Sequence, residues 1–529
     1  MHQFLQRHAA DVTGVLSGFD RMRFRGTLRL IANAGGLTRV MAHLGVLVKH
    51  FKPFALGVST QVRDAVEQVA AAAGRPFLYL QSWRTDKEAL AREIAARDHI
   101  ETGLIAVLAC VERCQSFDLR SDKAKGWLVV EPAVRKCQHY YLYYQHDRFG
   151  FSHVRVQSWL PLNLWVCVNG REWLARQLTA AGSPFTRQGN CVRPAEVARA
   201  QALLAAQVTT DWQAELAALA QAVNPRHSTL FGDFPLHYYW SLDESEWASD
   251  VLFRSPAALR ALYPRLIRHG IEALSCAEVM RYLGKRPTGD GAIPHRFSGE
   301  ILTDLRPVAT PRREEAVRLK HRVNRNWVKM YDKGPDVLRV ETVINDARDL
   351  RVYRHKEGEA HPDTTPKQWR ALRKGVADLA RRAELSQQAN ARYLDTLAAV
   401  DDAVAVGTLA APVCRRVRWK GRSARGLNPL GREDAALLRA INRGEFTITG
   451  FRNRDLRAAL FGAPPRDAAA ARRQSGRVTR QIRLLRAHGL VKKVGGTHRY
   501  QVTAKGRVII TALLTAQAAT TKQLLAAAA

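Results

Sequence analysis

Residues 468–507 read AAAARRQSGRVTRQIRLLRAHGLVKKVGGTHRYQVTAKGR and carry the clearest structural pattern in the chain. Val478, Ile482 and Leu485 recur at the spacing of one helical face, and Gly489 follows where a helix favours a left-handed residue. The other faces are largely basic and carry Arg472, Arg473, Arg477, Arg480, Arg483 and Arg486. A helix that needed only solubility would mix charges of both signs. The pattern therefore predicts an amphipathic helix whose solvent side suits a polyanion.

The segments on either side of this helix predict further short elements. Two helices are expected before it, and two short strands joined at Gly495 and Gly496 are expected after it. The predicted order is a helix at 435–441, a helix at 453–461, the basic helix, strands at 490–494 and 498–503, and a last helix from about Lys505.

This order, with LLRAHGLVKKVGGTHRYQVTAKGR across the hairpin, resembles the winged helix-turn-helix of bacterial DNA-binding proteins. The resemblance implies that the basic helix enters the major groove and that Gly495 to Arg499 forms the wing on the backbone or minor groove. The implied DNA-binding residues are Arg472, Arg473, Arg477, Arg480, Arg483, Lys492, Lys493, His498 and Arg499. The alternative is a winged helix used for protein contact, with solvated arginines.

The charge of the whole chain favours the same kind of partner. Its 529 residues include 82 Lys plus Arg against 48 Asp plus Glu, a formal net charge of +34. Such an excess predicts a nucleic-acid partner, most directly double-stranded DNA. No apolar run is long enough to span a bilayer and no basic amphipathic terminus is evident, so no membrane partner is predicted.

The cysteines and the N-terminus predict a cytoplasmic protein. Seven cysteines are scattered and mostly lie among apolar neighbours, as reduced thiols in a core do. Cys110 and Cys114 form the one close pair, and without a second pair at ligand spacing no zinc site is expected. The first ten residues lack the basic start and apolar centre of a secretory signal.

The rest of the chain predicts a multi-domain α/β (α+β) protein in which mixed sheets and helices precede the C-terminal winged helix-turn-helix. An N-terminal α/β domain is expected over residues 1–230, and a second over 231–410 with a hairpin at 327–345 and a long helix at 369–400. The expected remainder is a basic linker at 411–430, the winged helix-turn-helix at 431–514 and a tail at 515–529.

Residues 127–173 shift toward β-branched and aromatic side chains and predict three or four neighbouring strands. Apolar residues alternate there with basic or aromatic ones, so one sheet face could stack bases and meet phosphates. That face supports an alternative reading of the chain as an RNA-binding protein. Tyr140 and Tyr144 stand four apart, as in two-tyrosine nickases, but in a strand-forming run they are expected to pack in the core.

Residues 321–333 and 337–345 alternate in character on either side of Gly334-Pro-Asp336, which predicts a β-hairpin. Alternation assigns one face to Val328, Met330, Leu338, Val340 and Ile344, and the other to Lys329, Tyr331, Lys333, Arg339 and Glu341. A carboxylate among Lys, Arg and Tyr side chains can bind phosphate, hold a divalent ion or place a tyrosine for attack on a phosphodiester. A solvated hairpin with cross-strand ion pairs has the same composition.

The segment KMYDKGPDVLRVETVIN resembles a strand pair of the rolling-circle replication initiators of plasmids and filamentous phages. The matching positions are Tyr331, Asp332, Lys333, Arg339, Val340 and Glu341. In that family a carboxylate or histidine cluster holds a metal, and a tyrosine bonds transiently to DNA. The resemblance implies that Tyr331, Lys333 and Glu341 are catalytic and that Glu341 and Asp346, with Asp20 as a further candidate, hold Mg²⁺ or Mn²⁺. The histidine-hydrophobe-histidine triplet that binds the metal in such nickases does not occur in the sequence. A metal site in this chain would therefore be a variant built from carboxylates.

Phosphate contacts are expected from basic residues of the hairpin and linker, namely Lys329, Arg339, Arg415, Arg416, Arg418, Lys420 and Arg422. No Walker-type loop, dinucleotide fingerprint or Gly-x-Ser-x-Gly elbow occurs in the sequence. The sequence thus predicts a DNA-binding replication initiator or recombinase-like protein of a mobile genetic element, with metal-assisted nicking or strand transfer as its chemistry. The competing prediction is a non-catalytic winged-helix regulator whose front half senses a signal or forms a homodimer.

Overall fold

The computed structural model describes residues 1–123, 126–225, 227–232, 236–274, 276–283, 298–306, 316–348, 350–355, 366–398, 406–443, 446, 450–463, 465, 467–494 and 497–519. The chain divides into two compact units. The first, which we call the sheet unit, consists of Thr13–Leu252 and Val337–Gln387, and the second unit consists of Met1–Val12, Phe253–Asp336 and Gln388–Ala529. Among the described residues, no helix is both long enough and apolar enough to cross a membrane.

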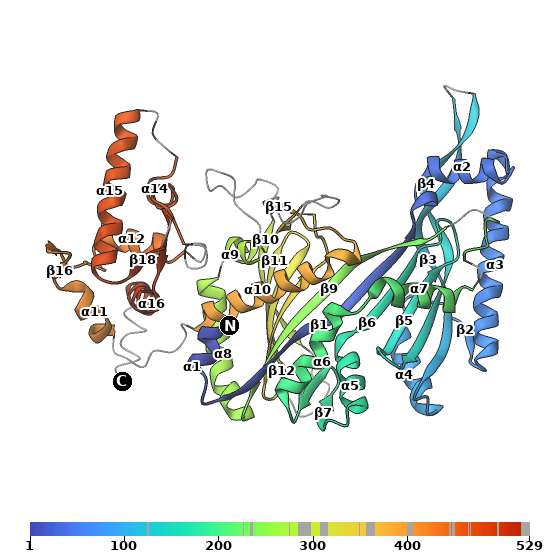
Figure 1. Ribbon diagram of the computed structural model, residues 1–529, viewed down its shortest axis with the longest axis horizontal. Coiled ribbons are helices and arrows are strands. Elements are labelled where there is room, and N and C mark those ends of the chain that lie inside the picture. Colours follow the sequence, from blue (N-terminus) through green and yellow to red (C-terminus); the bar gives the residue numbers. More distant parts are fainter. Residues whose placement is uncertain are drawn as a thin grey trace. The chain divides into compact units, whose positions relative to one another are not determined.

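The sheet unit is built on one large mixed sheet, as the predicted α/β class requires (Figure 1). Its strands lie in the order β13-β9-β1-β6-β5-β4-β3-β2, and β2 pairs with β3 in parallel whereas β3 to β6 pair in antiparallel fashion. Their bounds are β1 Val12–Leu28, β2 Phe77–Tyr79, β3 Gly103–Asp122, β4 Trp127–His146, β5 Gly150–Gln157, β6 Leu164–Asn169, β9 Tyr238–Phe253 and β13 Val337–Ile344. The predicted domain boundary at residue 230 does not coincide with a break in this sheet, because β9 and β13 extend it beyond β1.

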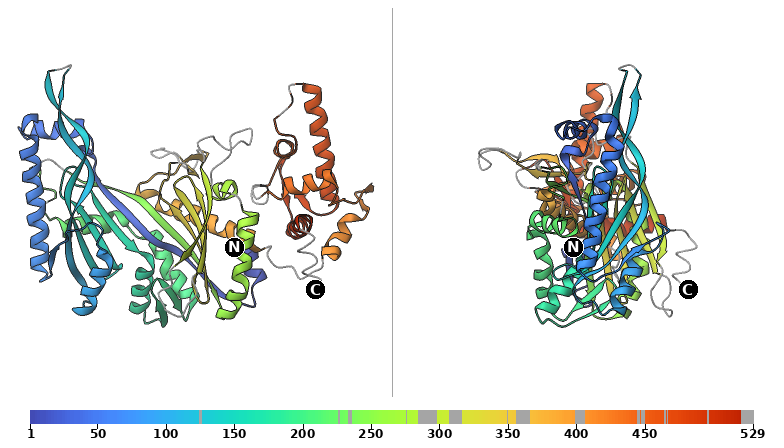
Figure 2. Two further views of the ribbon diagram at one scale, coloured as in Figure 1. Left: turned by 180° about the vertical axis from the view of Figure 1, so that it is seen from behind. Right: turned by 90° about the vertical axis from the view of Figure 1, so that its right-hand side faces the viewer.

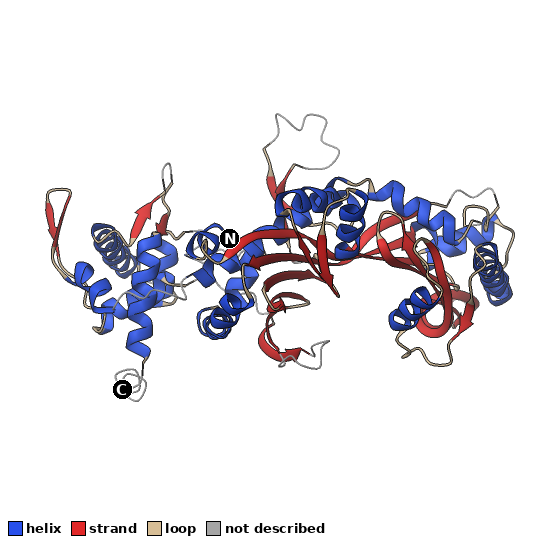
Figure 3. Ribbon diagram, turned by 90° about the horizontal axis from the view of Figure 1, so that it is seen from below, coloured by secondary structure: helices blue, strands red, loops and turns tan. Residues whose placement is uncertain are grey.

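The sheet is twisted, and helices pack along it (Figure 3). Strands β3 and β4 continue as a long two-stranded ribbon (Figure 2). The helices of this unit are α2 Ala34–His43, α3 Phe51–Ala72, α4 Lys87–Arg97, α5 Gly170–Ala180, α6 Val197–Thr209, α7 Trp212–Val223 and the first part of α10 Leu379–Leu397. Two small strand pairs, β7 Phe185–Gln188 with β8 Cys191–Pro194 and β14 Arg351–Arg354 with β15 Gln368–Ala371, complete it.

The two faces of the sheet differ along β1, β5 and β6, where buried residues alternate with half-buried ones. The buried set, with Met22, Phe24 and Val166 among its members, packs in one large core with Val62 of α3 and Leu216 of α7. The half-buried or exposed set forms the opposite face, which we call the open sheet face. Its members are Arg21, Arg23, Arg25, Tyr141, His153, Arg155, Trp165 and Cys167.

Two local details correct or explain the sequence pattern. The long helix expected at 369–400 begins only at Leu379, because Trp369 instead lies opposite Tyr353 in the β14–β15 ladder. Gly170, where β6 gives way to α5, lies so close to the main chain of β1 that an added Cβ would be 1.6 Å from the carbonyl oxygen of Phe19. Only glycine permits that approach.

The second unit contains α1 His2–Arg7, α8 Pro256–Ala273, α9 Cys276–Tyr282 and three strands in the order β10-β11-β12. These strands span Gly299–Arg306, Ala316–Val323 and Asn326–Gly334. The second predicted strand, 337–345, forms as β13, whereas the run predicted at 321–333 is divided: His321 to Val323 end β11, and β12 begins at Asn326 after a turn.

Helices and two short hairpins share a core at the C-terminal end of the chain, where Leu437, Leu456, Ile482 and Ile510 are buried together. The elements are α11 Val406–Cys414, β16 Val417–Trp419, β17 Arg422–Ala424, α12 Arg432–Ile441, α14 Asn453–Phe461, α15 Ala468–Ala487, β18 Val491–Lys493, β19 Tyr500–Val502 and α16 Ala504–Ala518. Helix, helix, basic helix, hairpin and helix follow one another as predicted, although Gly495 and Gly496 lie outside the described residues.

The segment predicted as a basic linker is instead an ordered part of this C-terminal region. Strands β16 and β17 form a hairpin, and Val413 and Leu427 on either side of it are buried in the same core. Arg425 binds both carboxylate oxygens of Asp434 at 2.7 Å, which fixes the segment to the start of α12. Sequence composition alone could not distinguish a tethered basic hairpin from a free basic chain.

Candidate functional sites

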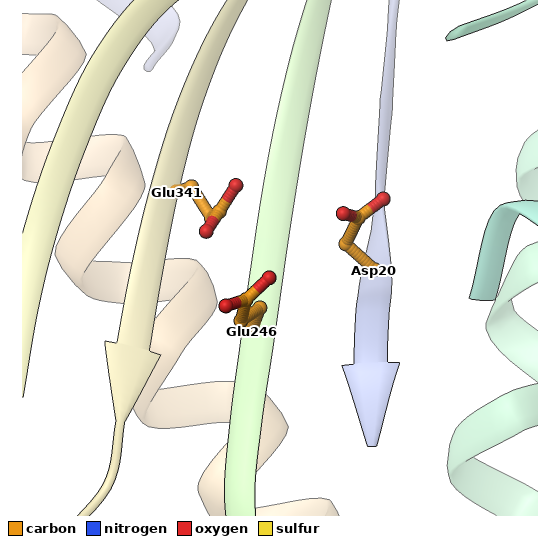
Figure 4. A group of neighbouring side chains, drawn as sticks. All are labelled: Asp20, Glu246 and Glu341. Atoms are coloured by element: carbon orange, nitrogen blue, oxygen red, sulfur yellow. The ribbon is translucent and has the colours of Figure 1, made fainter. Parts of the chain in front are cut away.

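Three acidic side chains converge on the sheet unit: Asp20 of β1, Glu246 of β9 and Glu341 of β13 (Figure 4). One ligand oxygen from each lies within 4.8 Å of the others. Strand β9 lies between β1 and β13, and Val343 is paired with Glu246 while Ala248 is paired with Glu341. Because residues two apart on a strand share a face, Glu246 and Glu341 project from the same side of the sheet. We call these three residues the carboxylate cluster.

Two fully buried arginines, Arg339 and Arg171, bind the carboxylates at the buried side of this cluster. Arg339 binds Asp250 through Nε and Nη2 at 2.5 and 2.7 Å, and its Nη1 lies 2.9 Å from Oδ1 of Asp20. Arg171, in the first turn of α5, donates to Asp250 at 2.8 Å. The side-chain amide of Asn190 donates to both oxygens of Asp20 at 2.9 and 3.0 Å. Such an ion network fixes the direction of Asp20 because each buried charge needs its partner.

The cluster reaches solvent on the side of Glu246, whose side chain is 15% exposed and lies 2.8 Å from Nη2 of Arg21. Burial lowers the pKa of Arg21, but the electrostatic influence of the neighbouring acidic groups, with Glu246 the largest contributor, raises it above its usual value. The guanidinium of Arg21 therefore lies in the negative electrostatic potential of the carboxylate cluster.

Carboxylates this close repel one another unless a proton or a cation lies between them. Oxygen ligands at this spacing fit a hard divalent ion such as Mg²⁺ or Mn²⁺, and the residues that would hold it are Asp20, Glu246 and Glu341.

Of the carboxylates considered from the sequence, the structure brings Glu341 and Asp20 together but not Asp346. Asp346 accepts hydrogen bonds from Arg348 at 2.6 to 3.0 Å, and those bonds lower its pKa. Glu246 was missed by the sequence analysis. It lies in the acidic run that begins β9, but nothing in the sequence indicates that β9 lies between β1 and β13.

The remaining residues of the predicted catalytic hairpin occupy different settings. Tyr331 and Lys333 lie on β12 in the second unit, where Tyr331 is only 6% exposed, and Lys329 on the same strand is half-buried. Arg339 was predicted to contact phosphate but is completely buried against Asp250. The solvated-hairpin alternative also fails for β13, because every residue of that strand is buried.

The basic face of α15 is exposed, as the sequence pattern predicts. Val478, Ile482 and Leu485 are buried in the C-terminal core, whereas Arg486 is half-buried with its guanidinium 5.1 Å from the ring of Trp419. The helix begins at a carboxylate cap, since Asp467 accepts from the backbone NH groups of Ala469 and Ala470. The exposed arginines are Arg472, Arg473, Arg477, Arg480 and Arg483.

A groove of about 620 Å³ separates α15 from the β16–β17 hairpin, and we call it the basic groove. Its charged lining residues are Arg422, Arg425, Glu433, Arg477, Arg480 and Arg483. The one acidic member, Glu433, lies 2.6 Å from Arg477. The other predicted phosphate-contacting residues of this hairpin and its approach, Arg415, Arg416, Arg418 and Lys420, are also exposed.

On the second hairpin of the C-terminal region, Lys492 and Lys493 of β18 are exposed. His498 is exposed and Arg499 is half-buried. In the described part of the expected wing, residues 497–499, His498 is thus accessible and Arg499 partly so.

Comparison of the chain with protein-family models found no match, and comparisons with curated proteins and with solved structures found no similar chain. The carboxylate cluster and the basic face of α15 are therefore the features from which a function can be inferred.

Proposed function

We propose that this protein binds double-stranded DNA through α15, used as the recognition helix of a winged helix-turn-helix. The observation that carries the proposal is the row of five exposed arginines on α15, three of which also line the basic groove. Arginine binds phosphate and guanine edges through paired donors, and a helix with one such face fits the major groove. The chain's charge of +34 would strengthen association with any nucleic acid. In this proposal the protein is a replication initiator or recombinase-like protein of a mobile genetic element.

Binding of the full-length protein to labelled duplexes, followed by fluorescence anisotropy at several salt concentrations, tests the duplex-binding part. The test variant combines Arg477→Ala, Arg480→Ala and Arg483→Ala. The control removes the same charge from exposed arginines on other elements, with Arg63→Ala, Arg97→Ala and Arg120→Ala combined. We expect the test variant to lose about 1–3 kcal/mol for each arginine that contacts a base, with relaxed sequence preference. Equal losses in the two variants would contradict a site on α15.

A second candidate function, metal-assisted cleavage of phosphodiesters, is favoured by the carboxylate cluster. A divalent ion bound by Asp20, Glu246 and Glu341 would supply Lewis-acid stabilisation of the charge that develops on the phosphate oxygens. The full-length protein with supercoiled plasmid and Mg²⁺ or Mn²⁺ should then produce nicked circles, and Glu246→Gln or Glu341→Gln should prevent nicking. Tyr331→Phe tests the tyrosine separately. Intact plasmid in every condition would favour the non-catalytic regulator.

A further inference from the structure

The open sheet face has an ordered row of cations and rings across four strands. Arg25 of β1 lies opposite Trp165 of β6, Trp165 lies opposite Arg155 of β5, and Arg155 lies opposite Tyr141 of β4. The guanidinium carbons of Arg25 and Arg155 are 5.7 and 4.5 Å from the Trp165 ring centre. Both arginines therefore lie within cation–π distance of the indole, and its half-buried ring belongs to the face that the main core does not cover.

The arginines of β1 extend this row toward the carboxylate cluster. Arg25, Arg23 and Arg21 follow one another at every second residue, which spaces them by about 6.6 Å along the strand. Exposure of the side chain increases toward the cluster, from 35% at Arg23 to 48% at Arg21. The series ends at Glu246, a member of the cluster, through its contact with Arg21.

The balance of charge on this face is positive. Arg21 pairs with Glu246, Arg23 pairs with Glu244, and Arg155 and Lys87 share Glu112. Arg25 has its contact with Trp165, and its buried Nε has no hydrogen-bond partner. Five cations against three carboxylates leave two positive charges beside an aromatic surface.

We propose that the open sheet face binds single-stranded DNA, with a base stacked on Trp165 and phosphates contacted by Arg23 and Arg25. Aromatic rings with neighbouring guanidinium groups bind unpaired bases and their backbone together, whereas a duplex keeps its bases stacked away from such a ring. The choice of DNA over RNA rests on the proposed function, because this face adjoins the carboxylate cluster of a chain proposed to act on DNA. The site is separate in residues from α15.

The test uses full-length protein in which Arg477→Ala, Arg480→Ala and Arg483→Ala remove the proposed duplex site. The anisotropy of labelled dT20 is then measured without the arginines of the basic groove, and substitutions on the open sheet face show how much of the remaining binding this face contributes. We expect Trp165→Leu to weaken binding about 5- to 150-fold, the range for losing one stacked base, and Trp165→Phe to retain most of it. Arg25→Gln should also weaken binding, while Arg120→Gln on an exposed part of β3 serves as the control. Thermal unfolding midpoints identify any variant that fails to fold, in which case Arg25→Gln carries the test.

Folded Trp165→Leu and Arg25→Gln variants that bind dT20 as tightly as their parent would overturn the proposal. Equal or tighter binding of U20, weakened by the same substitutions, would overturn the choice of DNA. Absence of duplex binding by the unaltered protein would count against the role of α15 alone, so the two proposals fail separately.

Discussion

Single residues matter most where charge is buried, and Arg339 is the clearest case. Its guanidinium is completely buried and joins Asp250 to Asp20. The sequence placed Arg339 and Glu341 on one face of a strand correctly, because period-two alternation is local. It could not indicate that this face is covered, because burial depends on partners supplied by β9, α5 and Asn190.

The first prediction concerns the stability of this ion network. Arg339→Ala removes the guanidinium that joins the buried carboxylates of Asp250 and Asp20 and so unbalances a buried ion network. We therefore expect the free energy of unfolding to fall by about 3–5 kcal/mol. Arg21→Gln removes a half-exposed arginine from the edge of the same cluster and should cost less, about 0–1 kcal/mol. Urea unfolding of the two variants provides the comparison, and similar values for both would contradict a structural role for Arg339.

A second prediction at this scale tests whether the carboxylate cluster holds a divalent ion without requiring any catalysis. Mn²⁺ at about 100 times its dissociation constant should stabilise the folded protein by about 2.7 kcal/mol, because an ion that binds only the folded state shifts the unfolding equilibrium. Glu341→Gln should abolish this gain, and Asp346→Asn should leave it unchanged because Asp346 binds Arg348 instead. A gain of equal size in Glu341→Gln would place the ion elsewhere.

At the scale of elements, α15 and β1 show what the sequence could and could not provide. Helix α15 was predictable because its apolar spacing, its basic face and its ends are all local features. The position of β1 between β9 and β6 was not, because strand pairing joins residues more than 200 positions apart along the chain. The carboxylate cluster inherits that difficulty, since its three members come from three such strands. The prediction of a linker at 411–430 was wrong for the same reason. Its apolar residues Val413 and Leu427 are buried against residues that come close only in the folded core.

The third prediction concerns the attachment of the β16–β17 hairpin through Asp434. Burial raises the pKa of Asp434, but hydrogen bonds from Arg425 and the backbone NH of Asn428 lower it, and the net result lies below the usual 3.8. The ionised carboxylate therefore stabilises the fold above pH 3.8, and this contribution is lost as the pH falls below that value. Asp434→Asn should cost about 1.5–3 kcal/mol at pH 7, the range for hydrogen bonds to a charged group, and progressively less in acid.

Urea unfolding of Asp434→Asn and the unaltered protein at pH 7 and at low pH measures this difference. Glu433→Gln is the matched control, because that neighbouring carboxylate is 70% exposed and its contact with Arg477 should contribute about 0–1 kcal/mol. A cost for Asp434→Asn that grows as the pH falls would contradict the assignment.

At the scale of the molecule, the described residues carry positive charge on two surfaces of different chemistry. The basic face of α15 is almost purely cationic, whereas the open sheet face combines cations with rings and nearby carboxylates. Phosphate contacts release counterions and stacking does not, so salt dependence can distinguish the two surfaces.

The last prediction uses this difference. For duplex DNA, the slope of the logarithm of affinity against the logarithm of salt concentration should become shallower by about 0.9 for each phosphate-contacting arginine removed from α15. For dT20, Arg25→Gln should reduce the slope by about 0.7, while Trp165→Leu should lower affinity at every salt concentration and leave the slope unchanged. Parallel titrations of the parent and the two variants between low and moderate salt measure both quantities. If Trp165→Leu changed the slope as much as Arg25→Gln, the indole would be supporting its neighbouring arginines instead of stacking on a base.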